Sequence, residues 1–438
     1  MRTSNRGPLA LEQFELREGS GLAAAAPASG PVNAELSGRP RAAAGQALDA
    51  AVAHLRSLQY PDGHWRGLLQ TNVTMDAEDL LLREFLGVRD PDRTQRAANH
   101  IRTEQSLDGS WNKFAGGDGD LSTTVEAYWA LRLAGDETEA EHMRRAAGWV
   151  REHGGPRQAR VFTHIWMALF GLWPWEDVPA LPPELVLLPN WFPLNPYDFA
   201  CWARQTIVAL TIVRSHRPAK PLPFDLAELG PGAPAAQKPA ASLIGRLLSR
   251  ADRIMRLYER RPIGWLRRHA LREAERWVIE RQEADGSWGG IQPPWVYSLI
   301  ALHLQGYPND HPVMASGLSG IDRFTVPAGE QCWLEACQSP VWDTALAMWA
   351  LADAGVDPGD EELVRAADWL LERQVTGRHG DWPVRRPHLE PGGWAFEYHN
   401  LNYPDTDDTA VVGLALRTIR HPQPERVEEA LRRATGWL

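Results

Sequence analysis

The stretch Ala97-Ala-Asn-His-Ile-Arg-Thr-Glu-Gln105-Ser-Leu-Asp-Gly109-Ser-Trp111 decides the fold of this chain. Its first nine residues carry apolar side chains at the i, i+3 and i+4 spacing of an amphipathic helix. The dipeptide Asp108-Gly109 is typical of a turn that ends a helix and starts a loop. The stretch therefore predicts a helix, a tight turn and a tryptophan at a fixed distance from the helix end.

The same pattern recurs along the chain. Gln-x3-Gly-x-Trp begins at Gln59, Gln105 and Gln282, and a version with a two-residue insertion spans Gln374–Trp382. Each copy follows a helix-like segment and precedes a loop and another helical run. We assign the motif a structural role, in which Gln bonds helix ends and Trp stacks to tie helix layers together. Helix pairs with very little strand patterning predict an all-α fold, an α/α barrel with inner and outer rings of helices.

Three carboxylates occupy four positions in Asp405-Thr406-Asp407-Asp408. Like charges this close do not all ionise readily, so one acid is held protonated and can act as a proton donor. The plain alternative is an N-cap, because Asp often accepts hydrogen bonds from the free backbone N–H groups at the start of a helix.

An internal comparison divides these two roles. The sequence WDTA at residues 342–345 has the same Asp-Thr-Ala opening, which aligns Asp343 with Asp408 and Trp342 with Asp407. A helix cap accounts for Asp343 and Asp408 but leaves the other two acids unexplained. We therefore expect Asp408 to be the cap and Asp407 to be the acid, although perturbed acids are only probabilistic markers of a site.

Composition excludes several classes of protein. The 438 residues are 44% hydrophobic and carry a net charge of −10, and the isoelectric point is near 5.8. This is a globular composition, and without a basic block interleaved with stacking aromatics it argues against a nucleic-acid partner. Cys201, Cys332 and Cys337 match no zinc or disulfide spacing, so a reducing compartment is the simpler interpretation. No uninterrupted apolar run reaches the ~18 to 20 residues that a membrane-spanning helix needs.

The chain divides into three predicted segments. We expect a disordered tail at residues 1–42, an N-terminal α/α barrel domain at 43–300, and the first part of a second barrel domain, with the Asp tetrad, at 301–438. The last segment, residues 426–438, repeats the helix that precedes each Gln, and a fifth motif is expected within a few residues. We therefore expect the second barrel to be incomplete.

A different stretch lies between the second and third motifs. Residues 174–240 are rich in Pro and predict an extended surface connection. Residues 242–258 then form a basic amphipathic helix, with Leu, Ile and Met on one face and Arg on the other. Such a helix within an acidic protein fits a membrane-associated insert near 215–260, and it fits an ordinary barrel helix with a solvated Arg face equally well.

Several stretches together resemble one known family. They are PDTDDTA (404–410), preceded by GGWAFEY, and SPVWDTALA, GGIQPPWVYSLIAL and NVTMDAEDLLL, together with the Gln-Gly-Trp repeats. The chain is similar to bacterial squalene–hopene cyclases from about Gln46 to Leu438. The related oxidosqualene cyclases carry an Asp-Cys-Thr-Ala-Glu version at the acid site, which this chain lacks. The resemblance implies a class II terpene cyclase, an isomerase that cyclises squalene to hopene or hopanol without metal or cofactor.

The resemblance also implies roles for individual residues. Asp407 would protonate the alkene, while Asp405 and Asp408 would orient the acidic proton and share the charge left behind. Aromatic faces would stabilise the carbocation through their quadrupole, which fits 20 Trp against 10 Phe and 8 Tyr. The residues implied to line the cavity are Phe162, Trp166, Trp202, Trp342 and Phe396, with Gln292, Pro293 and Tyr297 at its far end.

The resemblance further implies partners and a location. The substrate would be squalene or a similar polyprene, and the protein would be monotopic on the cytoplasmic face of the cell membrane, with a homodimer left open. Roughly a third of a typical member is absent, including a His that bonds the catalytic acid. We therefore expect weak or no cyclase activity from this chain alone.

Three alternatives remain open at the level of sequence. A non-catalytic polyprenoid-binding toroid would keep the repeats without the chemistry. A prenyltransferase-type barrel would need a zinc site of Asp, Cys and His. A cyclase for another linear polyprene would share the acid but differ in cavity length.

Overall fold

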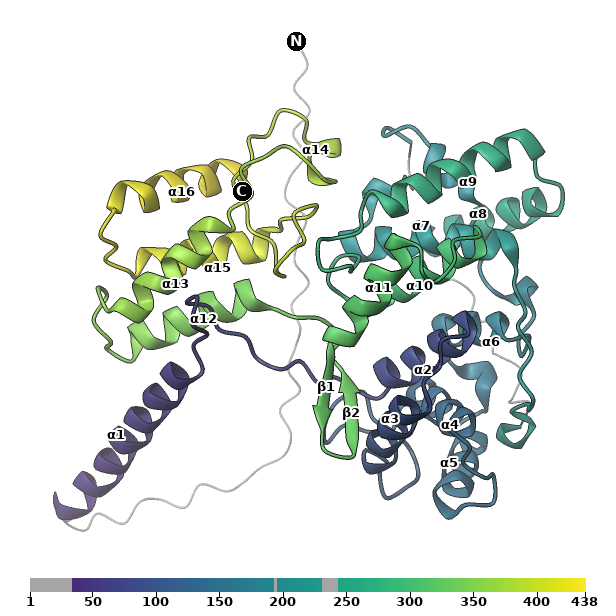
Figure 1. Ribbon diagram of the computed structural model, residues 1–438, viewed down its shortest axis with the longest axis horizontal. Helices are drawn as coiled ribbons and strands as arrows, with labels where there is room; N and C mark the ends of the chain where they lie inside the picture. Colours follow the sequence, from purple (N-terminus) through teal and green to yellow (C-terminus); the bar gives the residue numbers. More distant parts are fainter. Residues whose placement is uncertain (1–33, 193–194, 231–242) are drawn as a thin grey trace. The chain divides into compact units, whose positions relative to one another are not determined.

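The computed structural model describes residues 34–192, 195–230 and 243–438 of the chain (Figure 1). Sixteen α-helices and one two-stranded antiparallel sheet form within these residues, which confirms the all-α prediction. The helices are α1 (Ala34–Ser57), α2 (Thr74–Leu86), α3 (Pro91–Thr103), α4 (Leu121–Ala134), α5 (Glu141–Glu152), α6 (Val161–Leu169), α7 (Cys201–His216), α8 (Leu243–Arg260), α9 (Gly264–Ile279), α10 (Gln292–Leu304), α11 (Pro312–Arg323), α12 (Pro340–Asp353), α13 (Glu361–Glu372), α14 (Trp382–Arg385), α15 (Thr406–Arg417) and α16 (Pro424–Trp437). The strands are β1 (Thr325–Ala328) and β2 (Gln331–Leu334).

The chain divides into two compact units, residues 1–51 and 52–438. The helix α1 runs through this division. Residues 1–33 of the expected tail lie outside the described part of the chain, and residues 34–42 begin α1. All further description concerns the second unit.

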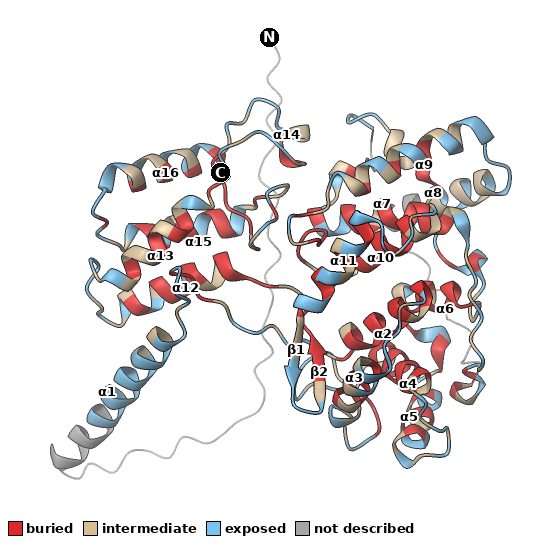
Figure 2. Cartoon of the chain, in the orientation of Figure 1, coloured by how far each residue is buried: buried red, intermediate tan, exposed pale blue. Residues whose placement is uncertain are grey.

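Two kinds of helix build this unit. The helices α2, α4 and α10 are buried along nearly their whole length (Figure 2). For α4 and α10 this fits their mostly apolar sequences, whereas α2 buries the charged side chains of Asp76, Glu78, Asp79 and Arg83 as well. Others, such as α5 and α13, bury a single apolar face. Asp120 caps α4 by accepting the Thr123 N–H at 2.9 Å, and Gly135 ends it with φ of 102°, a conformation that favours glycine.

The predicted motif ties a turn to the next helix. The side-chain amide of Gln105 donates to the Gly109 carbonyl at 3.0 Å and to the His142 carbonyl, at the start of α5, at 2.9 Å. The Trp111 indole N–H donates to the Ile101 carbonyl at 2.7 Å. The side-chain amide of Gln59 donates in the same way to the Gly63 and Glu362 carbonyls. That of Gln282 donates to the Gly286 and Val313 carbonyls. The structural role of Gln as a link between helix ends is confirmed.

The fourth motif is not where the sequence spacing placed it. The Gln374 amide donates to the Gly392 and Ala430 carbonyls, both at 2.8 Å, and not to Gly380. The Trp394 indole, not that of Trp382, donates to the carbonyl of the preceding helix, at Leu370. The prediction of a motif at Gln374–Trp382 is therefore wrong. Gly392 lies 18 residues after Gln374, whereas the other copies have a spacing of 4, so this copy contains an insertion of 14 residues, 378–391.

Two hydrophobic clusters fill the unit. The first runs from Val73 to Leu334, and the second from Val341 to Ala434. The second cluster also contains Trp65, whose backbone N–H donates to Thr344 Oγ1 at 3.0 Å. A segment from the start of the unit thus packs with helices from its end.

The Pro-rich stretch 174–240 is not simply an extended connection. Its prolines flank the proline-free segment Cys201–His216, which forms α7 and packs against α10. Val208, Ala209 and Ile212 of α7 are fully or almost fully buried. The surface prediction is therefore wrong for this segment.

The predicted basic helix is present as α8. Its two acids face the protein, since Asp252 accepts the Ala180 N–H at 2.9 Å and Glu259 pairs with Arg214 at 3.0 Å, whereas Arg250, Arg253 and Arg260 are exposed. Ile254 and Leu257 are each 68% exposed. Two apolar side chains in the described part of the helix are therefore exposed, and the membrane insert and the ordinary barrel helix both stay predictions.

Candidate active site

The acid cluster lies at the start of α15, where Asp405 is the N-cap. The Asp405 carboxylate accepts the Asp408 backbone N–H at 2.8 Å. The Asp405 backbone N–H donates to the Trp394 carbonyl at 3.0 Å. The predicted cap at Asp408 is therefore wrong, because the helix begins at Thr406, two residues before it. Asp343 is not a cap either, since its helix α12 begins at Pro340.

The internal alignment that suggested those caps is itself confirmed. The hydroxyl of Thr409 accepts the Trp394 N–H at 2.9 Å, just as Thr344 accepts the N–H of Trp65 at 3.0 Å. The two threonines occupy the same place in their motifs, so Asp408 and Asp343 are structurally equivalent.

Asp408 is the most deeply placed acid of the cluster. Its side chain is buried, and Oδ1 has no hydrogen-bond partner in the part of the chain that the structure describes. Burial, followed by the neighbouring Asp405, raises the pKa of Asp408 to about 9. Burial also raises the pKa of Asp405. Asp407 is exposed at the edge of the cluster.

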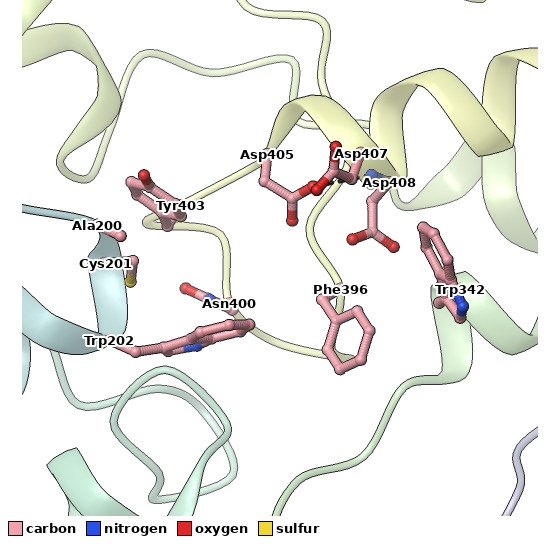
Figure 3. Close-up of a pocket in the computed structure, with 10 residues that line it drawn as sticks. All are labelled: Ala200, Cys201, Trp202, Trp342, Phe396, Asn400, Tyr403, Asp405, Asp407 and Asp408. Carbon is pink, nitrogen blue, oxygen red and sulfur yellow. Dashed lines mark hydrogen bonds between the residues drawn. The ribbon is translucent and has the colours of Figure 1, made fainter. Parts of the chain in front are cut away.

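The three acids border a cavity of about 260 Å³ (Figure 3). The start of α7 supplies one wall, with Cys201 and Trp202, and α12 supplies Trp342. The Phe396 ring lies between the two indoles, 6.2 Å from Trp202 and 6.5 Å from Trp342 between ring centres. The carboxyl groups of Asp405 and Asp408 point toward the space that these rings border (Figure 3). Three of the implied aromatic residues therefore meet the acid cluster.

Trp202 also borders a second cavity, of about 390 Å³, whose lining is almost entirely apolar. Phe162 and Pro293 line this second cavity. The Trp202 indole N–H donates to the Gly289 carbonyl at 2.9 Å, which fixes the ring between the two spaces. The two cavities share this one side chain as a wall.

The remaining implied residues form a buried group behind Phe162. The Tyr297 ring lies 6.1 Å from Phe162 and 5.7 Å from Trp166 between ring centres. Gln292, at the start of α10, is also buried. The Tyr297 hydroxyl has no hydrogen-bond partner among the described residues.

Comparison with known proteins decides the family. The family model for the squalene-hopene cyclase N-terminal domain matches residues 48–330, and that for the C-terminal domain matches residues 338–438. The chain belongs to the squalene–hopene cyclase family. The helix-rich architecture is that of the terpene-cyclase α/α toroid, as the repeats predicted.

Curated relatives from this family cover most of the chain. It is 43% identical to a squalene–hopene cyclase from Alicyclobacillus acidocaldarius, over 89% of this chain and 62% of that protein. It is 35% identical to a squalene–hopene cyclase from Zymomonas mobilis, over 89% of this chain and 61% of the relative. A dammaradiene synthase from Dryopteris crassirhizoma is 34% identical, over 90% of this chain and 58% of the relative. The chain thus spans about three fifths of the length of these proteins.

In this member of the squalene–hopene cyclase family, the sequence analysis missed a carboxylate pair. Arg160 donates to Glu126 at 2.9 Å and to Glu78 at 3.2 Å, next to the group around Tyr297. Burial, followed by the charge of Glu126, raises the pKa of Glu78 to about 8. The available signal was the presence of acids within two otherwise apolar helical runs, three in DAEDLLL and one in TTVEAYWAL.

The described part of this chain has no cluster of side chains suited to bind a metal ion. There, no group of three or more His, Cys, Asp and Glu side chains is placed to hold an ion. The three cysteines form no disulfide, and among the described residues they are not gathered with His and Asp into the zinc site that a prenyltransferase-type barrel requires.

Proposed function

We propose that this chain carries the proton-donating site of a class II terpene cyclase that converts squalene to hopene or hopanol. The observation that carries the proposal is the cluster of Asp405, Asp407 and Asp408 on an aromatic-lined cavity, where burial raises the pKa of Asp408 to about 9 and so keeps a proton in the cluster. Protonation of an isolated alkene needs a strong acid in a site with little water, because water would take up the proton or trap the cation. The names of the relatives from Alicyclobacillus and Zymomonas support squalene as the substrate.

The residues of the cluster divide the work. Asp407 donates its proton to the terminal alkene, as the family resemblance implies, while Asp405 and Asp408 orient that proton and share the negative charge left on the cluster. The rings of Trp202, Phe396 and Trp342 face the positive charge that then forms. The hydrocarbon gains one proton at the start and loses one at the end, so hopene is an isomer of squalene; hopanol forms when water adds to the last cation.

The far end of the substrate would reach the group around Phe162, Trp166 and Tyr297. Gln292 and Pro293 begin α10 at this point. One relative with a similar amino-acid sequence is named a dammaradiene synthase, a name with a different product. The alternative function is therefore the cyclisation of another polyprene, or of squalene to another product.

The test is the conversion of squalene by the purified protein in detergent, followed by gas chromatography. Product formation by this chain alone is expected to be weak, and replacement of Asp407 by Asn is expected to bring it below detection, because loss of a general acid typically costs about 100-fold or more. Asp92→Asn is the matched control, because Asp92 is also an exposed acid at the second position of a helix, α3. Tight squalene binding without product, unchanged by Asp407→Asn, would instead support a non-catalytic polyprenoid-binding toroid.

A peripheral attachment to the membrane surface is the second part of the proposal. None of the helices in the described ranges combines the length and the apolar character needed to span a bilayer. The exposed Ile254 and Leu257 of α8, with Trp265 nearby at 66% exposure, form an apolar surface suited to shallow insertion. A homodimer and the cytoplasmic leaflet remain predictions from the family resemblance.

Flotation with lipid vesicles tests this attachment. The double variant Ile254→Ser/Leu257→Ser is expected to reduce the vesicle-bound fraction several-fold, because it removes the two large exposed apolar side chains in the described part of α8. The control is Leu107→Ser, which changes a leucine that is 95% exposed on a loop. Equal binding of both variants and the unmodified protein would contradict the proposal.

A further inference from the structure

The 14-residue insertion in the fourth motif, residues 378–391, carries a buried carboxylate that the repeat fold does not require. The side chain of Asp381 is 1% exposed. Its Oδ2 accepts Arg204 Nη1 at 2.5 Å, and its Oδ1 accepts Arg281 Nε at 2.9 Å. Charge-assisted hydrogen bonds of this kind are strong and directional, so the insertion is held firmly between two arginines from distant parts of the chain.

One of these arginines belongs to a wall of the acid-bearing cavity. Arg204 follows Trp202 by two residues on α7, and it also donates to the Phe199 carbonyl at 2.8 Å. Its guanidinium lies 5.6 Å from the ring centre of Tyr403, which lines the same cavity. Asp381 therefore fixes an arginine that contacts both the α7 wall and the loop before the acids.

The insertion also holds that loop directly. The Asp381 N–H donates to the Asn402 carbonyl at 2.9 Å, and the Asn402 amide donates to Glu283 at 2.7 Å. Gly380 has φ of 81°, and a Cβ there would lie 2.3 Å from the Asn402 Cα. Only glycine allows this approach. Three residues after Asn402, Asp405 caps α15.

We propose that Asp381 is a positioning residue that clamps the loop ending at Asp405 onto α7, which keeps the acid wall and the aromatic wall of the cavity together and water out. The importance of the clamp for catalysis rests on the proposed function. The clamp itself has a consequence that can be measured without turnover, because a loosened wall admits water to Asp408.

The experiment is an NMR titration of the full chain with ¹³C-labelled aspartate carboxyl groups, in which Asp408→Asn identifies the Asp408 signal. Asp408 faces the charges of Asp405, Glu397 and Asp407, but burial is the first cause of its raised pKa. Asp381→Asn removes the clamp charge, so the titration midpoint of Asp408 is expected to fall by about one pH unit or more. A change in overall stability alone would leave this midpoint in place.

The matched control is Asp322→Asn. Asp322 also binds two arginines, Arg83 at 2.7 Å and Arg93 at 2.9 Å, far along the chain from the acid cluster. This variant is expected to leave the Asp408 midpoint unchanged.

A milder variant keeps the test decisive if Asp381→Asn does not fold. Arg281→Lys retains the positive charge at a side chain that is 12% exposed. It cannot reproduce the contact of two arginine nitrogens, Nε and Nη2, with Asp381 Oδ1. A smaller shift in the same direction is expected. An unchanged Asp408 midpoint in Arg281→Lys and in folded Asp381→Asn overturns the clamp. A shifted midpoint in a protein whose squalene conversion is unchanged by Asp407→Asn leaves the clamp standing and removes the proposed function.

Discussion

Buried carboxyl groups dominate this molecule at the scale of single residues. Glu397 lies directly after Phe396, between the cavity and the backbone of Gly290, and is 5% exposed. Burial raises its pKa to about 8, with Glu283 and Asp405 adding to the effect. An acid of this kind stays protonated in the folded protein and ionises when the chain unfolds.

Replacement of Glu397 by Gln is therefore expected to change how stability depends on pH. The unfolded Glu loses its proton near pH ~4.3, whereas the folded group keeps its proton to about pH 8, so rising pH favours the unfolded state across this window. The stability of Glu397→Gln relative to the unmodified protein should rise by about 1 kcal/mol per pH unit between pH ~5 and ~8. Urea denaturation at several pH values measures this difference. The exposed control Glu361→Gln should give a flat difference, and a flat difference for Glu397→Gln would contradict the prediction.

Sequence alone located the acid cluster but not the roles within it. The sequence shows that three carboxylates are crowded, whereas their burial depends on residues far away in the chain, such as Trp202 and Trp342. The cap was placed at Asp408 because two Asp-Thr-Ala stretches align, yet a cap is set by where the backbone turns into the helix. The acids Glu78 and Glu126 were missed for the same reason, since only packing brings them to Arg160.

At the scale of elements, the repeated motif is a hydrogen-bonded unit, and its fourth copy provides a direct comparison. Trp394→Phe removes an indole bond of 2.7 Å to the Leu370 carbonyl in the core. The expected loss is about 1 to 3 kcal/mol of unfolding free energy, because a buried carbonyl loses its donor. Trp382→Phe is the matched variant, since the Trp382 indole nitrogen has no partner among the described residues. It should cost less than Trp394→Phe in thermal or urea denaturation. The reverse order would place the motif at Trp382 after all.

The helices themselves follow from the sequence because each carries its own apolar period and turn signals. The fourth motif was misplaced because Gly380-x-Trp382 matches the Gly-x-Trp pattern. The glycine and tryptophan that make the hydrogen bonds of the motif, Gly392 and Trp394, follow an insertion that the spacing does not reveal. The helix α7 was missed for a related reason, as prolines on both sides concealed a proline-free segment. Local patterns therefore fix helices well and the connections between them poorly.

At the scale of the whole unit, two connections join the hydrophobic clusters. Residues 66–72 and 335–339 run between them and are linked through the buried carboxylate of Glu335. It pairs with Arg66, accepts the Leu69 N–H at 3.1 Å and accepts the Gln338 amide at 2.8 Å. We expect this link to couple the unfolding of the two clusters.

Glu335→Ala is expected to break that cooperation. Loss of one partner leaves Arg66 without its carboxylate, which should cost about 3 to 5 kcal/mol. Because the lost hydrogen bonds join the segments that connect the clusters, calorimetry should resolve two unfolding transitions for the variant and one for the unmodified protein. Asp357→Ala, which breaks a largely exposed pair with Arg420, should leave the calorimetric profile nearly unchanged. A single, merely lowered transition for Glu335→Ala would show that the link is not what couples the clusters.

The packing of Trp65 with Thr344 has a consequence for synthesis of the chain. These residues are 279 positions apart, and ribosomes add roughly 5 to 20 residues per second, so Trp65 is made about 14 to 56 s before its partner. The first cluster, from Val73 to Leu334, is fully translated within that interval. The earliest part of this unit to leave the ribosome is therefore among the last to reach its native contacts, and the apolar side chain of Trp65 must stay soluble until then.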